Sequence, residues 1–560
     1  MKKPVPFTVL DRPSQLRTLG SERFDLAVIG GGITGAGIAL DAASRGLRTV
    51  LLEKGDFASG TSSKSTKLIH GGLRYLKQFD FWLVKEVGSE RAIVHQLAPH
   101  LVLPEKMLLP LIEGGSYGKW LTSFGLKVYD ILAQVADDDR RRMLEKDEAL
   151  QREPLLPDQE LKGGGYYAEY RTDDARLTLE NIKTSLQFGA TALNYMRVDG
   201  FLLNGDGKIC GVRAADLLGG GSLEIAAEYV INATGPWVDG LRTLDGRLQG
   251  KRLHLTKGVH LVFPHEKLPV RQSIYFDVPD GRMIFAIPRG KVTYVGTTDT
   301  DYQGDIDHVK VDLADAVYLL AAVNHMFPSM ELELADIESS WAGLRPLIHE
   351  EGKSATELSR KDELFTSESG LISIAGGKLT GYRKMAERAV NRVAKSMEES
   401  GRVLEGSRTD AVPLCGNGFA DFRGVKDYAK NVARRLEPMG FDQARAWELV
   451  TTYGIQAEQI LSLFDSFSDP DTVWRLLKAE LHFGIAHEMV TSPADFFIRR
   501  TGRLYFDIGT MKKYLSQTAE ACAARLGADS AQADAWVGEL EALIREHSDF
   551  DLEYRSAQLI

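Results

Sequence analysis

The stretch VIGGGITGAGIALDAASRGLRTVLLEK, residues 28–54, places a glycine-rich turn between an apolar strand and a helix. Gly30, Gly32 and Gly35 follow the pattern G-x-G-x-x-G, which permits a tight turn, close approach of a pyrophosphate and close helix–strand packing. The helix N-terminus favours phosphate because its first amide groups lack partners within the helix. Glu53 ends the next apolar run, where its carboxylate can accept ribose hydroxyls. Strand, turn, helix and acid in this order predict a dinucleotide site rather than an ordinary glycine turn.

Length and composition limit the other possibilities. A chain of 560 residues is too long for one hydrophobic core and predicts several domains. The formal net charge of -10 argues against a nucleic acid partner, which needs a concentrated basic surface. The three cysteines are odd in number and far apart, so we expect reduced thiols in a cytoplasmic protein and no metal site. No apolar run reaches the roughly 18 residues that a membrane-spanning helix needs.

The apolar patterns predict an α/β fold with three domains. A strand at 256–264 and a hairpin around Arg289-Gly290 indicate an antiparallel sheet. A helix after Gly377 has one apolar face, formed by Ala386, Ala389, Val390, Val393 and Met397. The expected domains are a Rossmann nucleotide-binding domain (20–98, 168–252 and 342–400), an antiparallel-sheet substrate domain (99–167 and 253–341) and a helical C-terminal domain (401–560).

Two further strand–loop junctions favour FAD over NAD as the dinucleotide. The strand in YVINATGPW runs into Ala233, Thr234 and Gly235, and a later strand runs into Gly376, Gly377, Lys378, Leu379 and Thr380. Glutathione-reductase-like FAD proteins have similar junctions, and amides at the later one can stabilise negative charge on a reduced flavin. Ser62 and Ser63 in TSSKSTK add hydroxyl groups that we expect to contact the cofactor. Each segment by itself is also compatible with a simple turn.

Six segments resemble FAD-dependent glycerol-3-phosphate dehydrogenases. They are HGGLRYL, NATGPWVD, TKGVH, VGTTDTDYQGD, GLRPL and GGKLTGYRKMAE, in the same order as in that family between about residues 22 and 395. The resemblance implies oxidation of sn-glycerol 3-phosphate to dihydroxyacetone phosphate by hydride transfer to FAD, with a membrane quinone as the final acceptor. It also implies that the substrate contacts Arg74, Tyr75, His260, Arg345 and Lys378, of which the last three are catalytic.

The residue types suit this chemistry. A phosphate dianion calls for guanidinium or ammonium groups, and a neutral imidazole can take the proton of a hydroxyl that is being oxidised. Each residue also has a structural alternative: His260 as a hydrogen-bonded sheet residue, Arg345 in an ion pair, and Lys378 as a cap of the strand–helix junction. Which cation holds phosphate and which faces the alcohol stays open at this stage.

Other functions and the cellular location also remain as hypotheses. The resemblance leaves two alternatives, an oxidase that reduces oxygen to hydrogen peroxide and a flavin-binding regulator without catalysis. A membrane quinone as acceptor implies a protein attached peripherally to the inner face of the cell membrane, and a homodimer is possible. One candidate contact is the segment 496–515, where aromatic residues alternate with Arg499, Arg500, Arg503, Lys512 and Lys513. Its alternative is a buried aromatic core with solvated arginines.

Overall fold

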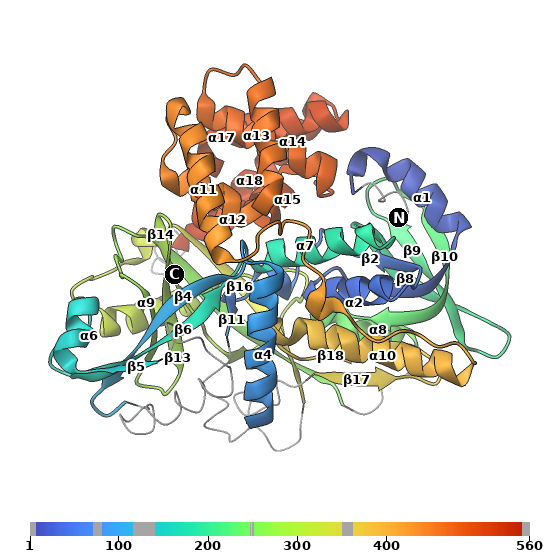
Figure 1. Ribbon diagram of the computed structural model, residues 1–560, viewed down its shortest axis with the longest axis horizontal. Helices are drawn as coiled ribbons and strands as arrows, with labels where there is room; N and C mark the ends of the chain where they lie inside the picture. Colours follow the sequence, from blue (N-terminus) through green and yellow to red (C-terminus); the bar gives the residue numbers. More distant parts are fainter. Residues whose placement is uncertain are drawn as a thin grey trace, which may run out of the picture.

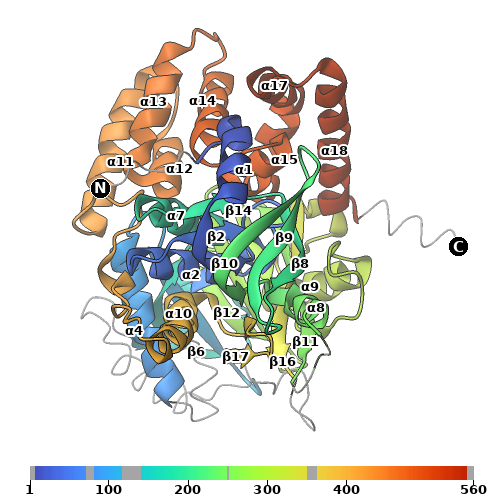
Figure 2. The same ribbon diagram turned by 90° about the vertical axis from the view of Figure 1, so that its right-hand side faces the viewer.

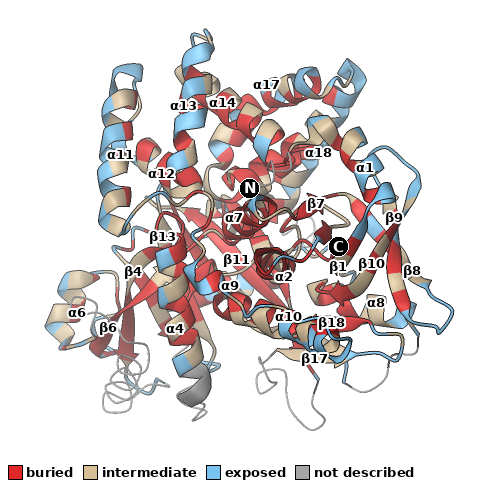
Figure 3. Cartoon of the chain, turned by 45° about the vertical axis from the view of Figure 1, so that its right-hand side comes forward, coloured by how far each residue is buried: buried red, intermediate tan, exposed pale blue. Residues whose placement is uncertain are grey.

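The computed structural model describes residues 7–70, 81–115, 141–246, 248, 251–349 and 362–550. Two β-sheets lie side by side, and a body of helices from the C-terminal third of the chain covers them (Figure 1, Figure 2). Buried residues concentrate in the sheets and in the helices between them, whereas the outer faces of the C-terminal helices are exposed (Figure 3). Arg74 and Tyr75, both predicted to bind substrate, lie outside the described residues.

The first sheet is built around five parallel strands. Its order is β17-β18-β10-β1-β2-β7, with β8 and β9 added beside β10. The bounds are β1 (Arg23–Ile29), β2 (Thr49–Leu52), β7 (Thr191–Leu193), β8 (Met196–Leu203), β9 (Ile209–Asp216), β10 (Ser222–Asn232), β17 (Glu363–Thr366) and β18 (Ile372–Ala375). Because β1 pairs in parallel with both β2 and β10, and β10 with β18, the loops that follow these four strands meet at one edge of the sheet.

Helices cover this sheet as the apolar patterns predict. α2 packs between α7 and α10. The bounds are α2 (Ile33–Ser44), α4 (Phe81–Leu97), α7 (Asp174–Gln187), α8 (Val238–Leu244) and α10 (Tyr382–Glu399). The predicted apolar face of α10 is confirmed, since Ala386, Ala389, Val390, Val393 and Met397 are all buried. α2 ends just before Gly46, whose φ of 94° is the left-handed conformation of a helix C-terminus.

The second sheet has ten mostly antiparallel strands, in the order β15-β11-β14-β13-β12-β4-β6-β3, with β16 beside β11 and β5 beside β6. Its strands are β3 (Leu68–Ile69), β4 (Leu103–Ile112), β5 (Arg142–Leu144), β6 (Leu161–Arg171), β11 (Leu253–Pro264), β12 (Ser273–Asp277), β13 (Met283–Arg289), β14 (Val292–Gly296), β15 (Thr300–Asp301) and β16 (Ser339–Ile348). The predicted hairpin turns at Gly290. β16 and the end of β6 lie in this sheet. The predicted boundaries assigned their residues 342–348 and 168–171 to the nucleotide-binding domain. The division into domains stays a prediction.

Further helices complete the molecule at its N-terminus and beside the second sheet. They are α1 (Arg12–Ser21), α6 (Lys146–Arg152) and α9 (Leu313–Met326). The C-terminal body consists of α11 (Phe422–Leu436), α12 (Gln443–Tyr453), α13 (Ala457–Ser466), α14 (Thr472–His487), α15 (Pro493–Asp495), a π-helical turn (Phe496–Arg500), α16 (Arg503–Phe506), α17 (Ile508–Leu526) and α18 (Ser530–Ser548). It contacts β16 through α16 and α18, and α7 through the π-helical turn. Among the described residues, no helix is both long and apolar enough to span a bilayer.

The structure corrects the part of the membrane-contact hypothesis for residues 496–515 that rests on the three arginines, whereas Lys512 and Lys513 are exposed. Arg499 and Arg500 pair with a buried carboxylate, and Arg503 pairs with Glu480 inside the helical body. Their side chains are 12%, 0% and 3% exposed, so they cannot reach lipid headgroups. The aromatic residues of the segment are largely core residues, as the alternative proposed, but Arg500 and Arg503 are buried with them and Arg499 is only partly exposed, rather than solvated.

Candidate active site

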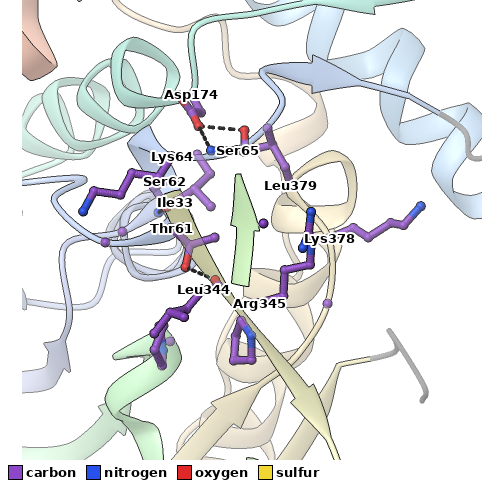
Figure 4. A pocket seen from close by; sticks show the side chains of 18 of the residues that line it. Ile33, Thr61, Ser62, Lys64, Ser65, Asp174, Leu344, Arg345, Lys378 and Leu379 are labelled. Carbon is purple, nitrogen blue, oxygen red and sulfur yellow. Dashed lines mark hydrogen bonds between the residues drawn. The ribbon is translucent and has the colours of Figure 1, made fainter. Parts of the chain in front are cut away.

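A cavity of about 900 Å³ lies where the loops at the edge of the first sheet face β11 and β16 of the second. Figure 4 shows Ile33, Thr61 and Ser62 on one side of it and Arg345 and Lys378 on the other. Most predicted site residues line this cavity: Gly30, Gly32, Glu53, Ser62, Ala233, Thr234, Gly235, His260, Arg345, Gly376, Gly377, Lys378, Leu379 and Thr380. Gly35 and Ser63 are buried and are not among the lining residues.

The glycine turn after β1 has the geometry that its sequence predicts. Gly30 has a φ of 109°, and a Cβ there would lie 2.6 Å from the carbonyl oxygen of Ala233. A Cβ at Gly35 would lie 1.8 Å from the oxygen of Gly30, so only glycine lets α2 pack this closely on the turn. Ile33, the first residue of α2, donates its amide to Ser62 Oγ at 2.9 Å. The N-terminus of α2 therefore opens into the cavity beside a serine hydroxyl.

Glu53 braces this turn from the end of β2. Its Oε2 accepts the amide of Gly31 at 2.6 Å, and its Oε1 accepts the amide of Gly55 at 2.8 Å. Burial raises the pKa of the Glu53 carboxyl, while the two amides act in the opposite direction. Each carboxylate oxygen has further acceptor capacity, which leaves Glu53 able to bind a ribose hydroxyl from the cavity side.

The two later junctions approach the same cavity. Thr234 is fixed by Asn232 Oδ1, which accepts its hydroxyl at 2.7 Å. Gly376 and Gly377 have φ values of 77° and 85°, and a Cβ on Gly377 would lie 2.3 Å from Met385 Sδ. The short helix that follows, Leu379–Gly381, continues into α10. Two helix N-termini, a carboxylate and three glycine-bearing loops thus line one cavity, a donor and acceptor set that fits a dinucleotide.

His260 lies on β11, in the wall opposite the nucleotide loops. It is 1% exposed, and its ring stacks on Trp341 with centroids 4.7 Å apart and planes at 11°. Its Nε2 lies 3.0 Å from Thr66 Oγ1, while its Nδ1 is buried without a hydrogen-bond partner among the described residues. Burial, together with the charges of Arg345 and Lys67, holds the pKa of His260 well below its usual range. The imidazole is therefore neutral near pH 7 and can accept a proton.

Arg345 reaches the cavity from β16. Its Nη1 donates to the carbonyl of Thr298 at 3.0 Å and its Nη2 to Thr297 Oγ1 at 2.8 Å, and Asp299 Oδ1 lies 3.4 Å from Nη1. Gly258 on the neighbouring strand makes room, since a Cβ there would lie 2.4 Å from the guanidinium. Arg345 is thus in an ion pair, as the structural alternative predicts, and it also lines the cavity; its role in binding substrate stays a prediction.

Lys378 precedes the short helix before α10. A lysine carries only donors, and no capping hydrogen bond from its side chain is seen among the described residues. Lys378 nevertheless stands at the N-cap position of this helix, so the structural alternative and a role in the site both stay open. Lys378 supplies a second cation to the wall that holds Arg345 (Figure 4).

Thr66, Trp341 and Thr297 were missed by the sequence analysis as partners of the site. Trp341 stands opposite His260 in the β11–β16 register, and Thr297 follows the end of β14, which pairs with β11. Thr66 and Thr297 lie in two of the segments singled out above, TSSKSTK and VGTTDTDYQGD, but only the tertiary structure shows which side chains they contact.

Comparisons with known proteins agree with this geometry. A family model described as FAD dependent oxidoreductase matches residues 25–383. A second model, described as the C-terminal domain of alpha-glycerophosphate oxidase, matches residues 407–533. The chain is 49% identical to the aerobic glycerol-3-phosphate dehydrogenase of Bacillus subtilis (strain 168), over 91% of this chain and 92% of that protein. It is 45% identical to the enzyme of that name from Staphylococcus haemolyticus, over 96% and 97%.

Solved structures show the same relationship. The glycerol-3-phosphate dehydrogenase of Bacillus halodurans, solved in complex with FAD, superposes with a TM-score of 0.82 at 42% identity, over 97% of this chain and 98% of that one. The L-alpha-glycerophosphate oxidase of Mycoplasma pneumoniae superposes with a TM-score of 0.54 at 18% identity, over 69% of this chain and 97% of that one, and shares the fold. The predicted fold class, a Rossmann FAD-binding unit with an antiparallel sheet and a helical C-terminal domain, is confirmed. The chain belongs to the FAD-dependent oxidoreductases, in the family of aerobic glycerol-3-phosphate dehydrogenases.

Proposed function

We propose that the protein uses FAD to oxidise sn-glycerol 3-phosphate to dihydroxyacetone phosphate and passes the electrons to a membrane quinone. The observation that carries the proposal is that His260, Arg345 and Lys378 line the same cavity as the dinucleotide loops. A chain with a net charge of -10 can hold an anionic substrate only through locally placed cations, and this wall supplies two. The names of the close relatives support the choice of substrate.

In this proposal the protein binds the substrate and moves one proton. FAD, when bound, supplies the acceptor for the hydride that leaves the secondary carbon. Arg345 and Lys378 hold the phosphate and favour the negative charge that develops on the reacting oxygen. The substrate hydroxyl loses its proton towards His260, whose Nε2 reaches the cavity wall at Thr66 Oγ1. A neutral imidazole in this position acts as a general base.

The acceptor and the location are further parts of the proposal. A quinone dissolved in the bilayer calls for a cytoplasmic protein that associates peripherally with the inner face of the membrane, as a monomer or homodimer. The arginines of residues 496–515 do not provide the contact, because they are buried. Oxygen is the alternative acceptor, and one observation favours it: the matched C-terminal domain carries the name of an oxidase.

Anaerobic mixing with sn-glycerol 3-phosphate tests the function directly. We expect the absorbance of the bound flavin to be lost, followed by reoxidation on addition of a soluble quinone analogue. Reoxidation by air at the same rate, with hydrogen peroxide produced, would identify an oxidase instead. A flavin that stays oxidised with this substrate would contradict the enzyme proposal and favour a flavin-binding regulator.

A further inference from the structure

The turn that follows β2, residues 53–60, is held by the C-terminal helical body. Asp56 in this turn is 2% exposed. Arg500 grips its carboxylate with two hydrogen bonds, Nη1 to Oδ2 at 2.7 Å and Nη2 to Oδ1 at 2.8 Å. Arg499 adds a third from Nε to Oδ2 at 2.5 Å, and Asn194 donates to Oδ1 at 3.0 Å. A buried, bidentate pair of this kind fixes both the distance and the relative orientation of the guanidinium and the carboxylate.

Both arginines belong to the π-helical turn Phe496–Arg500. Arg500 Nε and Nη2 also donate to the carbonyl of Glu488, at 3.0 and 2.7 Å, and Arg499 Nη2 donates to Asp495 Oδ1 at 2.7 Å. Each guanidinium is therefore held by hydrogen bonds within the helical body as well as by Asp56. π-Helical turns are rare and occur frequently at functional sites.

The same turn forms part of the cofactor wall. Glu53, Lys54, Ser59 and Gly60 line the cavity, while Asp56 points to the opposite side. The amide of Ala58 donates to the carbonyl of Gly31 at 3.0 Å, which ties the turn to the glycine loop. A Cβ on Gly31 would lie 2.6 Å from the ring of Phe57, so these two segments are in tight contact.

The conformation of the turn is one that needs support from its surroundings. Ala58 has a φ of 62°, in the left-handed region that a residue with a side chain rarely adopts. Such a conformation is unfavourable by itself and persists where neighbouring contacts determine it. The hydrogen bonds of Asp56, two residues before Ala58, can hold this conformation. They fix the turn on the side that faces away from the cavity.

We propose that Arg499 and Arg500 are positioning residues of the FAD site: through Asp56 they hold residues 53–60 in the conformation that presents Glu53 and Ser59 to the cofactor. The C-terminal body then completes the nucleotide site, although none of its residues lines the cavity among those described. The inference rests on FAD as the cofactor and is independent of the substrate and of the electron acceptor.

The rate of FAD release from purified holoenzyme tests this role. Arg500→Met should release FAD about tenfold faster than the wild type and should increase hydrogen exchange in residues 53–60. Arg503→Met is the matched control, because Arg503 is 3% exposed and pairs with Glu480 Oε2 at 2.6 Å within the same helical body. We expect this control to lower the melting temperature but to release FAD at the wild-type rate.

The comparison between the two variants decides the outcome. If both release FAD equally fast for the same loss of melting temperature, or if Arg500→Met releases it at the wild-type rate, the positioning role is wrong. Should Arg500→Met fail to fold, Arg500→Lys keeps the charge but cannot make the bidentate contact. The proposal then requires Arg500→Lys to release FAD faster than the wild type, and an unchanged rate overturns it.

Discussion

Two arginine–aspartate pairs in this molecule, Arg500 with Asp56 and Arg345 with Asp299, differ in how far the guanidinium is exposed. Between Arg500 and Asp56 both side chains are 0% exposed, and every nitrogen of the guanidinium donates a hydrogen bond. Arg345 meets Asp299 at 3.4 Å, and its side chain keeps 23% exposure at the wall of the cavity. The first pair lies behind the turn after β2, and the second lies in the cavity wall that we propose binds the substrate.

The difference shows what separates a structural cation from a ligand-binding one. A guanidinium carries five donor hydrogens. Where protein acceptors meet it from all sides, as at Arg500, its charge stabilises the fold and no anion can approach. Where part of it faces a cavity, as at Arg345, the same group can bind a phosphate or an alkoxide. Residue type alone does not distinguish the two cases, because exposure to the cavity decides.

The largest effect should come from breaking the buried pair. Arg500→Met leaves Asp56 as a buried charge without its bidentate partner, and we expect the free energy of unfolding to fall by about 3–5 kcal/mol. Chemical denaturation followed by far-UV circular dichroism measures this. Arg435→Met, which removes an exposed pair with Glu458 and Asp465, should cost less than about 1 kcal/mol. Equal losses for the two variants would refute the distinction.

Removing Arg345 from its pair with Asp299 should affect catalysis rather than stability. Arg345→Met removes charge-assisted hydrogen bonds to the substrate, so kcat/KM for sn-glycerol 3-phosphate should fall by an amount equivalent to about 1.5–3 kcal/mol. The flavin content should stay at the wild-type level, in contrast to Arg500→Met. Steady-state kinetics and the flavin absorbance of the same preparation check both points. If Arg345→Met lost flavin but kept the wild-type kcat/KM, Arg345 would support the cofactor and would not bind the substrate.

The pH dependence of stability should also distinguish the buried pair. Despite the opposing effect of burial, Arg500 and Arg499 hold the pKa of Asp56 well below its usual range. Its stabilising contribution is therefore present above the unfolded value of about 3.9 and is lost as pH falls towards the folded pKa, by up to about 1.4 kcal/mol per pH unit. The measurement is the free energy of unfolding of the wild type and of Asp56→Asn as a function of pH. We expect a constant difference between pH 5 and 8 that shrinks below pH 4; a difference that persists unchanged at pH 3 would contradict the assignment.

His260 should show a smaller effect of the same sign, because its pKa is also lowered in the folded protein. Its pKa is lowered by burial and by Arg345 and Lys67, so the unfolded chain binds a proton below about pH 6.5 that the folded chain does not. Stability should therefore decrease from pH 7 to 5.5, by about 1.4 kcal/mol from this residue. His260→Gln should reduce that slope, as measured by denaturation at both pH values. An unchanged slope would mean that the pKa of His260 is the same in the folded and unfolded protein, which contradicts the lowered pKa.

The nucleotide wall was largely predictable, and the substrate wall only in part. Gly30, Gly35 and Glu53 lie within one short β-α-β segment, so their spacing along the chain already determines their spacing in space. The strand and helix patterns for β11 and α10 were equally local. The surroundings of His260 were not, because Trp341 and Thr66 reach it only through strand pairing and packing of distant segments.

The segment 496–515 shows where the sequence analysis failed. A run of arginines between aromatic residues looks the same whether the charges face solvent or buried carboxylates. The outcome depended on Asp56, which is 444 positions away from Arg500 and packs against it only after the helical body has formed.

By itself, the sequence determined that this protein binds a dinucleotide through a Rossmann turn, with FAD favoured by two later glycine junctions, because those signals depend on backbone geometry within a few consecutive residues. Tertiary structure alone decided which cations line the cavity and which are buried against carboxylates, and that the C-terminal helices reach the turn behind Glu53. Those properties depend on burial and on partners far away in the chain, and the free energy of a charge is set by its surroundings rather than by its neighbours in sequence.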